Sequence, residues 1–184
     1  MNAKELTLYP RTQCVINDLS AFVHAHDKVE YYLRHHAKEK SDARLYGLLK
    51  TTTDPIVVPV ENLNKNGYSS WGKFNEERPN EIMVRANLLR GLEVAKLEET
   101  IYGTAFLVLA TLLHETVHYC RFKNQEDTKT YEYGDGFERD AFGSYINENN
   151  SNHYGAIYKR SFVRLTNALS KDKSVIRDRA RHIP

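Results

Sequence analysis

The sequence predicts an α+β fold that is mainly helical and carries a small sheet. Three observations predict this class. The stretch from Ala105 to Leu113 contains no charged residue, which is typical of a buried helix. Two short segments, Ile56–Val60 and Glu81–Arg85, have the β-branched or alternating pattern of strands. Apolar residues at helical spacing occupy much of the remaining chain, so helices should outnumber strands.

The composition is that of an ordinary globular protein. The chain has 184 residues, of which 41% are hydrophobic and 27% charged, with no low-complexity tract and no evident repeat. This length predicts a single domain over residues 1–184, large enough to bury a core without metal or disulfide staples. The two cysteines, Cys14 and Cys120, lie far apart and in no metal-ligand spacing.

The charge pattern predicts neither a nucleic-acid partner nor a membrane span. The net charge is only +2, and the basic stretch over residues 159–181 is interpreted as a solvated helix face. Residues 1–6 lack the apolar core of a secretory signal, and no uncharged segment reaches transmembrane length. We therefore expect a chain made in the cytosol, whose export would need a machine that reads no cleavable signal.

The first half of the chain divides into helices followed by strands. Ile16–Arg44 mixes apolar and charged residues at near-helical spacing, which predicts one or two amphipathic helices. Ile56–Val60 is predicted to be an edge or bulged strand, because Pro59 cannot donate to a ladder. Residues 64–80 form a loop or hairpin, and Glu81–Arg85 is a second strand whose exposed edge an extended substrate could join.

The second half is predicted to be helical. Helical spacing resumes over Ala86–Leu97, and Gly103 or Thr104 is expected to open the helix that contains the uncharged stretch. The remaining expected elements are a polar connection over residues 124–136, a helix from near Phe137 towards Glu148, and a last amphipathic helix over residues 154–169.

The uncharged helix ends in a His-Glu-x-x-His motif. His114 and His118 are four residues apart, so both imidazoles share one helical face and can meet one divalent ion. Glu115 borders the same site, where it can take a proton from water. The motif predicts a zinc site of the metallopeptidase kind, with Zn²⁺ as cofactor and Glu115 as general base.

A catalytic zinc ion normally has three protein ligands, so a third must come from elsewhere. Glu138 is the favoured candidate, because it lies twenty residues after His118 near the start of the next predicted helix. Asp135 in the preceding Gly-rich turn and Asp140, on another face of that helix, are the alternatives. Tyr133, His153 and Tyr154 are potential oxyanion donors, but core or surface roles are favoured for each.

Two segments resemble a known family. Residues 112–119, Leu-Leu-His-Glu-Thr-Val-His-Tyr, and 136–143, Gly-Phe-Glu-Arg-Asp-Ala-Phe-Gly, resemble the metallopeptidase toxin domains of bacterial polymorphic toxin systems, effectors linked to type VI secretion. The resemblance implies zinc ligation by His114, His118 and Glu138, with Glu115 as general base. It also implies a zincin-like fold, in which a second helix carrying the third ligand packs against the His-Glu-x-x-His helix. A bacterial origin, delivery into a target cell and a cognate immunity protein are further implications.

Three functions are compatible with these residues. The first is hydrolysis of a peptide or protein substrate by a zinc peptidase toxin. The second keeps the zinc chemistry but cleaves peptide amides of peptidoglycan, which present the same carbonyl to the site. The third is a non-catalytic protein with a structural zinc, which is disfavoured because structural sites usually close with four protein ligands.

Overall fold

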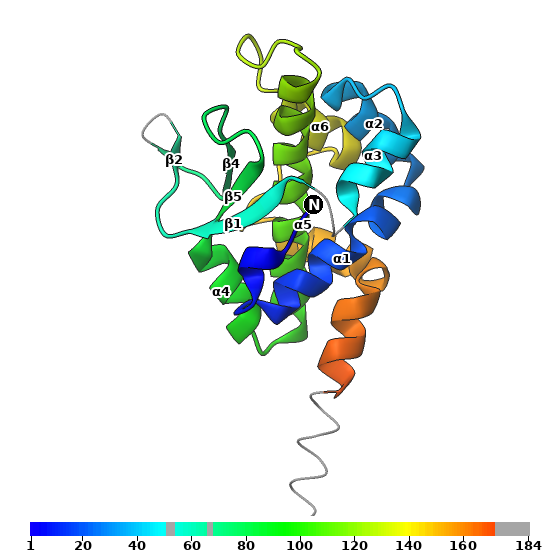
Figure 1. The fold of residues 1–184 in the computed structure, drawn as a ribbon. Helices are drawn as coiled ribbons and strands as arrows, with labels where there is room; N and C mark the ends of the chain where they lie inside the picture. The colour runs from blue at the N-terminus through cyan, green and yellow to red at the C-terminus, as the bar shows by residue number, and fades with distance from the viewer. Residues whose placement is uncertain (51–53, 66–67, 172–184) are drawn as a thin grey trace, which may run out of the picture.

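The structure, a computed structural model, describes residues 1–50, 54–65 and 68–171. Helices account for most of these residues, and the strands form a three-stranded and a two-stranded sheet. The predicted α+β class, mainly helical with a small sheet, is therefore confirmed. Helix α5 runs through the middle of the molecule, with the sheet on one side and the N-terminal helices on the other (Figure 1).

Three helices precede the sheet, in the region where the sequence predicts one or two. They are α1 (Pro10–His24), α2 (Asp27–Ala37) and α3 (Asp42–Leu49). The proline that opens α1 loses no helical hydrogen bond at that position. The side chain of Ser41 caps α3 by accepting a hydrogen bond from the amide of Arg44. Helices α1 and α2 pack directly on α5, and α3 packs on α1.

The three-stranded sheet has the order β1-β5-β4. β1 (Ile56–Val60) pairs in parallel with β5 (Glu81–Arg85), and β4 (Gly72–Phe74) pairs with β5 in the antiparallel direction. Both strands that the sequence predicts have the predicted bounds, and β1 lies at an edge as Pro59 requires. The prediction that β5 offers an exposed edge is wrong, because β4, which arises within residues 64–80, covers that edge.

Helix α5 (Glu98–Lys123) is the core element. It begins before the predicted Thr104, since Glu98 and Glu99 place negative charge in its first turn, where the helix dipole favours it. Among the described residues, α5 is the one helix long and apolar enough to cross a membrane, but 83% of its most apolar window is buried inside the fold. Its apolar side chains therefore face other elements of the same chain.

Three further helices pack against α5: α4 (Ala86–Val94), α6 (Tyr133–Phe142) and α7 (Ser151–Tyr158). Helix α7 approaches α5 very closely at Gly155, where a Cβ atom would lie 2.5 Å from the amide nitrogen of Gly103. Helix α6 starts before the predicted position and ends earlier, with a left-handed glycine as its cap. This earlier start matters for the site described below.

The predicted last helix over residues 154–169 is interrupted. α7 ends at Tyr158, a single 3₁₀ turn follows, and residues 163–171 are helical again. Phe162, fully buried, occupies the break. Residues 172–181 of the basic stretch lie outside the described residues. The shorter elements of the fold are η1 (Lys4–Leu6), β2 (Asn64–Lys65), β3 (Tyr68–Ser69) and η2 (Lys159–Ser161).

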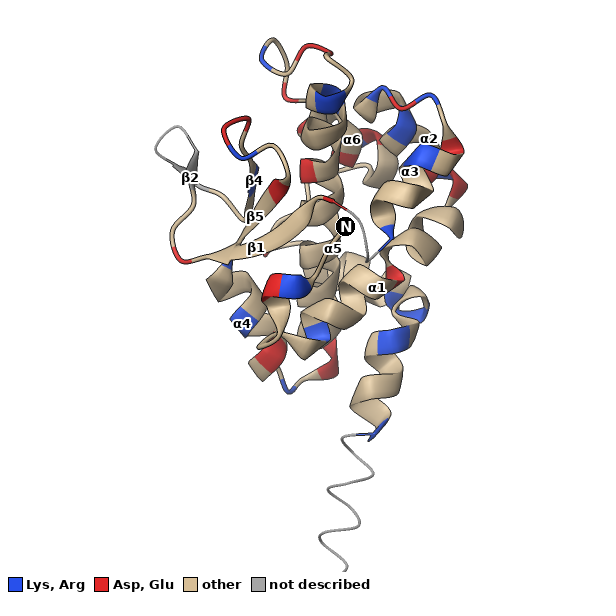
Figure 2. Ribbon diagram, in the orientation of Figure 1, with Lys and Arg blue, Asp and Glu red and all other residues tan. Residues whose placement is uncertain are grey.

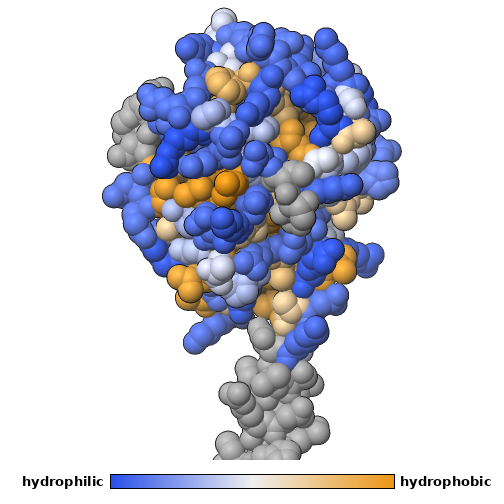
Figure 3. Space-filling model, in the orientation of Figure 1, coloured by the Kyte–Doolittle hydropathy of each residue, from blue (hydrophilic) through white to orange (hydrophobic). Residues whose placement is uncertain are grey.

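The visible surface is mostly hydrophilic, and apolar side chains are interspersed over it in patches (Figure 3). Positive and negative residues are mixed along the helices and loops rather than segregated by element (Figure 2). Neither view therefore shows a broad field of one charge sign of the kind that accompanies a polyanion-binding face.

Candidate metal centre

The two histidines of the motif lie on one face of α5, as their spacing predicts. The ring centroids of His114 and His118 are 5.2 Å apart. Their side chains are 14% and 12% exposed, so both rings are largely withdrawn from solvent but still reach the cleft. The helix therefore presents two imidazoles together, near its C-terminal end.

Glu132 brings a carboxylate to both rings. Its Oε1 lies 3.5 Å from His114 Nε2 and 2.5 Å from His118 Nε2. One ligand atom from each of these three residues falls within 4.8 Å of the others. His118 Nε2 is buried and makes no hydrogen bond of normal geometry within the described residues. An imidazole nitrogen so placed, beside a carboxylate oxygen, fits the donor set of a divalent metal.

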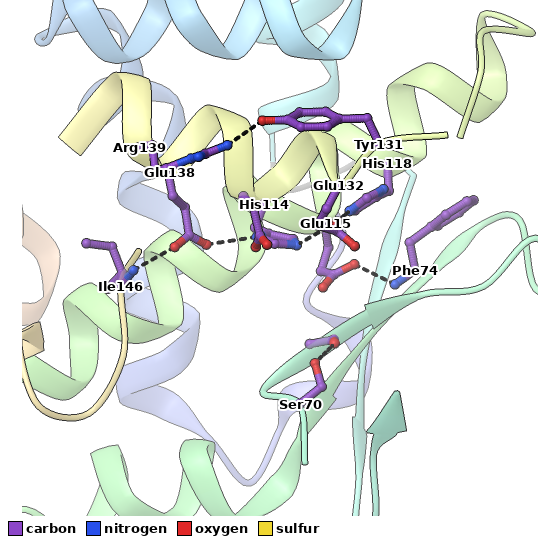
Figure 4. Close-up of polar contacts among 12 residues, drawn as sticks. Ser70, Phe74, His114, Glu115, His118, Tyr131, Glu132, Glu138, Arg139 and Ile146 are labelled. Atoms are coloured by element: carbon purple, nitrogen blue, oxygen red, sulfur yellow. Dashed lines mark hydrogen bonds and ion pairs between the residues drawn. The ribbon is translucent and has the colours of Figure 1, made fainter. Parts of the chain in front are cut away.

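Glu138 contacts the opposite side of the His114 ring. Its Oε1 lies 2.8 Å from His114 Nδ1, and its Oε2 accepts the amide N–H of Ile146 at 2.7 Å (Figure 4). The residue is only 6% exposed. An ionised carboxylate can only accept, so in the neutral form of His114 the proton lies on Nδ1 and Nε2 keeps its lone pair for a ligand. The assignment of Glu138 as third ligand thus stays a prediction. In the structure, Glu138 contacts Nδ1 of His114, the ring nitrogen that faces away from Glu132.

The other acidic candidates are less central. Asp135 Oδ1 is 3.9 Å from His114 Nδ1. Asp140 is hydrogen-bonded instead to Nε2 of His36, a residue of α2, at 2.7 Å. Sequence reasoning missed Glu132, because it placed the start of the helix near Phe137. The actual start of α6 makes Glu132 the N-cap residue. A glutamate just before the Gly-rich turn was the available signal.

Glu115 sits between α5 and the sheet. Its Oε2 accepts the amide N–H of Phe74 at 2.7 Å, and the residue is 6% exposed. The close approach depends on Gly72, where a Cβ atom would lie 2.5 Å from Thr111 Cγ2 and 2.9 Å from Glu115 Cγ. Strand β4 therefore fixes one carboxylate oxygen of Glu115 by a backbone hydrogen bond.

The electrostatic surroundings of His114 favour a positive charge. Burial alone lowers the pKa of an imidazole, but hydrogen bonds with Glu132 and Glu138 and the nearby charge of Glu115 outweigh burial. The pKa of His114 is consequently raised to about 10. Surroundings that attract a proton this strongly also attract a divalent cation.

Two cavities open on either side of Glu115, which lines both. One, of about 340 Å³, extends towards Trp71 and Tyr145, and the other, of about 420 Å³, extends towards Lys73 and Tyr131. The two histidines divide between them, with His114 in the first and His118 in the second. The geometry is a cleft with the candidate metal ligands at its middle.

The side chains considered as oxyanion donors point elsewhere. The Tyr133 hydroxyl donates to Asp127 at 2.9 Å, and the Tyr154 hydroxyl donates to the carbonyl of Phe142 at 3.1 Å. His153 is exposed on α7 and lines neither cavity. The aromatic residues that do line the cleft are others, including the two tyrosines named for the cavities above.

One glycine shapes the site from α6. A Cβ atom at Gly134 would lie 2.4 Å from His114 Nε2. The imidazole can occupy its place only because this position has no side chain. The first turn of α6 therefore packs directly on the ring.

Two imidazoles on a His-Glu-x-x-His helix, a carboxylate beside them and an adjacent glutamate in a cleft define a metallopeptidase-like centre. Residues 6–143 match the family described as metallopeptidase toxin 3, Tox-MPTase3. This range is more than half of the chain and includes Glu115 and every candidate metal ligand, so the chain belongs to this family. Neither a curated protein nor a solved structure matches it.

Proposed function

We propose that this member of the metallopeptidase toxin family is a zinc-dependent peptidase in which His114, His118 and Glu132 hold the ion. The observation that carries the proposal is the convergence of the three ligand atoms within 4.8 Å, beside Glu115. Nitrogen and carboxylate donors in this number suit a catalytic zinc ion, which keeps one position for water. Zinc supplies positive charge that polarises a substrate carbonyl and makes water more acidic.

Glu132 is preferred to Glu138 as third ligand on geometric grounds. Both oxygens of Glu138 are already engaged, one by His114 Nδ1 and one by the amide of Ile146. A carboxylate on the outer nitrogen fixes the tautomer and orientation of a ligating histidine. We therefore assign Glu138 the orienting role, which the sequence alone leaves open.

Glu115 is the proposed general base. Phe74 holds Oε2, so Oε1 accepts the proton of a water molecule in the cleft and returns it to the leaving amine. Because the carboxylate is anchored by a backbone amide, its orientation does not depend on a mobile side chain.

We further propose that the fold is zincin-like and that the substrate is an extended peptide docked beside β4. Strand β4 lies at the free edge of the sheet next to α5, and an extended peptide can lie along such an edge. Its side chains on the two sides of the scissile bond would enter the two cavities. This assigns to β4 the docking role that sequence reasoning gave to β5. We also propose that the chain acts as one domain, since a single hydrophobic cluster connects α1, the sheet and α5 to α7.

The biological setting follows from the family. A metallopeptidase toxin acts on a target cell, so we propose that a producing bacterium delivers this chain. We also propose that a cognate immunity protein neutralises the chain inside the producing bacterium. Type VI secretion is the route that the sequence resemblance favours.

The proposal is tested by zinc analysis of the dialysed wild type and of three isosteric variants, Glu132→Gln, Glu138→Gln and Glu115→Gln. We expect one zinc per wild-type chain, most of it lost in Glu132→Gln, and affinity about 10- to 100-fold weaker in Glu138→Gln. Glu115→Gln should keep its zinc yet cleave nothing.

Activity is measured on unfolded protein substrates and, in parallel, on purified peptidoglycan, so that the two amide targets are separated. Full zinc retention in Glu132→Gln with loss in Glu138→Gln would restore Glu138 as the ligand. Activity that survives in Glu115→Gln would exclude the proposed base.

A further inference from the structure

The proposed third ligand lies at the end of a loop without helix or strand. Residues 124–132 connect α5 to α6 and appear beyond the C-terminal end of α5 in Figure 1. Glu132 is half-buried, and the backbone on its N-terminal side has no ladder to fix it. A ligand on such a segment needs another source of order, because small displacements weaken a metal site.

Asp127 organises this loop. Its Oδ1 accepts the amides of Lys129 at 2.9 Å and Thr130 at 3.2 Å, and its Oδ2 accepts the hydroxyl of Tyr133 at 2.9 Å. These donors hold the pKa of Asp127 well below its usual range, with the Lys129 amide the largest cause. The carboxylate therefore ties the middle of the loop to the first residue of α6.

Arg121, on α5, contacts both Asp127 and Tyr133. Its Nε donates to the carbonyl of Asp127 at 2.6 Å, and its guanidinium lies 3.3 Å over the ring of Tyr133. Its Nη1 donates to the carbonyl of His36 on α2 at 3.0 Å. The side chain is almost wholly buried, at 2% exposure. An arginine so placed is fixed by three elements at once.

We infer that Arg121, Asp127 and Tyr133 form a polar clamp that positions Glu132 for metal binding. Arg121 is one turn beyond His118 on the same helix, and Tyr133 is covalently next to Glu132. The clamp thus fixes the position of Glu132, which the loop carries, relative to α5, which carries the two histidines. This inference rests on the proposed function, and the three residues are positioning residues that touch neither metal nor substrate.

The test compares Tyr133→Phe with the wild type in Co²⁺ binding to metal-free protein, followed by the visible absorption of the ion. Phenylalanine keeps the ring over Arg121 and removes only the hydroxyl that Asp127 accepts. We expect affinity about tenfold weaker, the lower end for outer-shell changes, together with an altered Co²⁺ spectrum. Asp127→Ala also removes the hydrogen bonds from the amides of Lys129 and Thr130, so it should weaken Co²⁺ binding at least as much. The double variant should lose no more than Asp127→Ala alone, because the hydrogen bond between Tyr133 and Asp127 is already absent from each single variant.

The matched control is Tyr102→Phe. Tyr102 is buried and its hydroxyl bonds Thr166 at 2.8 Å, away from the cleft, so this variant loses a comparable hydrogen bond without touching the loop. It should leave Co²⁺ affinity and spectrum unchanged. Equal losses in both tyrosine variants would assign the effect to general destabilisation and overturn the clamp.

The remaining outcomes separate the clamp from the function on which it rests. Wild-type affinity and spectrum in Tyr133→Phe would overturn the clamp and leave the metal site standing. Less than one Co²⁺ per wild-type chain, or binding undiminished in Glu132→Gln, would overturn the metal site and the clamp together.

Discussion

Helix α5 and the loop over residues 124–132 contribute to the same candidate site in opposite ways. The helix holds His114 and His118 by its own backbone hydrogen bonds and by burial on almost every side. The loop holds Glu132 through a few polar contacts centred on Asp127. A ligand pair on a rigid helix and a third on a clamped loop differ in how easily each is lost, and the loop is the weaker half.

The largest expected consequence is a difference in hydrogen exchange. In metal-free protein, amides in the middle of α5 should exchange about a thousandfold or more slowly than those of residues 125–131, since the former open only with the core. Mass spectrometry of exchange, resolved by peptide, measures the ratio. Similar protection in the two segments would remove the distinction between them.

An intermediate effect on stability and activity is expected where β4 packs against α5. Gly72→Ala inserts a methyl group 2.5 Å from Thr111 Cγ2 and should push the strand from Glu115. We expect a loss of about 1–3 kcal/mol in the free energy of unfolding and a fall in peptidase activity with zinc retained.

The control for this substitution is Gly91→Ala in α4, where a Cβ atom would meet nothing within 4 Å. It should leave activity intact and raise the free energy of unfolding by up to about 1 kcal/mol. Urea titration and turnover of a peptide substrate measure both pairs of quantities. Unchanged activity in Gly72→Ala would mean that Glu115 does not depend on the strand.

The smallest expected effect is a pH dependence within the loop. A carboxylate whose pKa is lowered on folding stabilises the fold above its unfolded pKa, about 3.9 for aspartate, and loses that contribution as pH falls through the folded value. The amide of Lys129 and the other donors lower the pKa of Asp127 in this way. Metal-free wild type should therefore exceed Asp127→Asn in unfolding free energy at pH 7, and the gap should shrink below about pH 4.

Urea titrations of both proteins at pH 7, 5 and 3 follow this gap. A difference that widened in acid would have the wrong sign for a carboxylate with a lowered pKa, and would remove Asp127 from the ordering of the loop.

The same contrast explains what the sequence predicts and what it leaves out. The bounds of β1 and β5, the core helix and the shared face of His114 and His118 follow from local periodicity. Glu132 follows from no period, because a clamp of residues from α5, the loop and α6 determines its position. The central place of β5 was equally unpredictable, since β4 has only three residues and no strand-like pattern. Pairing between distant segments is a tertiary property.

Gly134 offers a way to separate recognition from toxicity. Alanine there would put a methyl group into the space of the His114 ring, yet would alter no charge, no ligand and none of the exposed surface, because the residue is buried. An immunity protein that reads the outer surface would still bind such a chain. A single buried methyl group would thus disable the proposed metal site and leave unchanged the exterior that the proposed immunity protein would recognise.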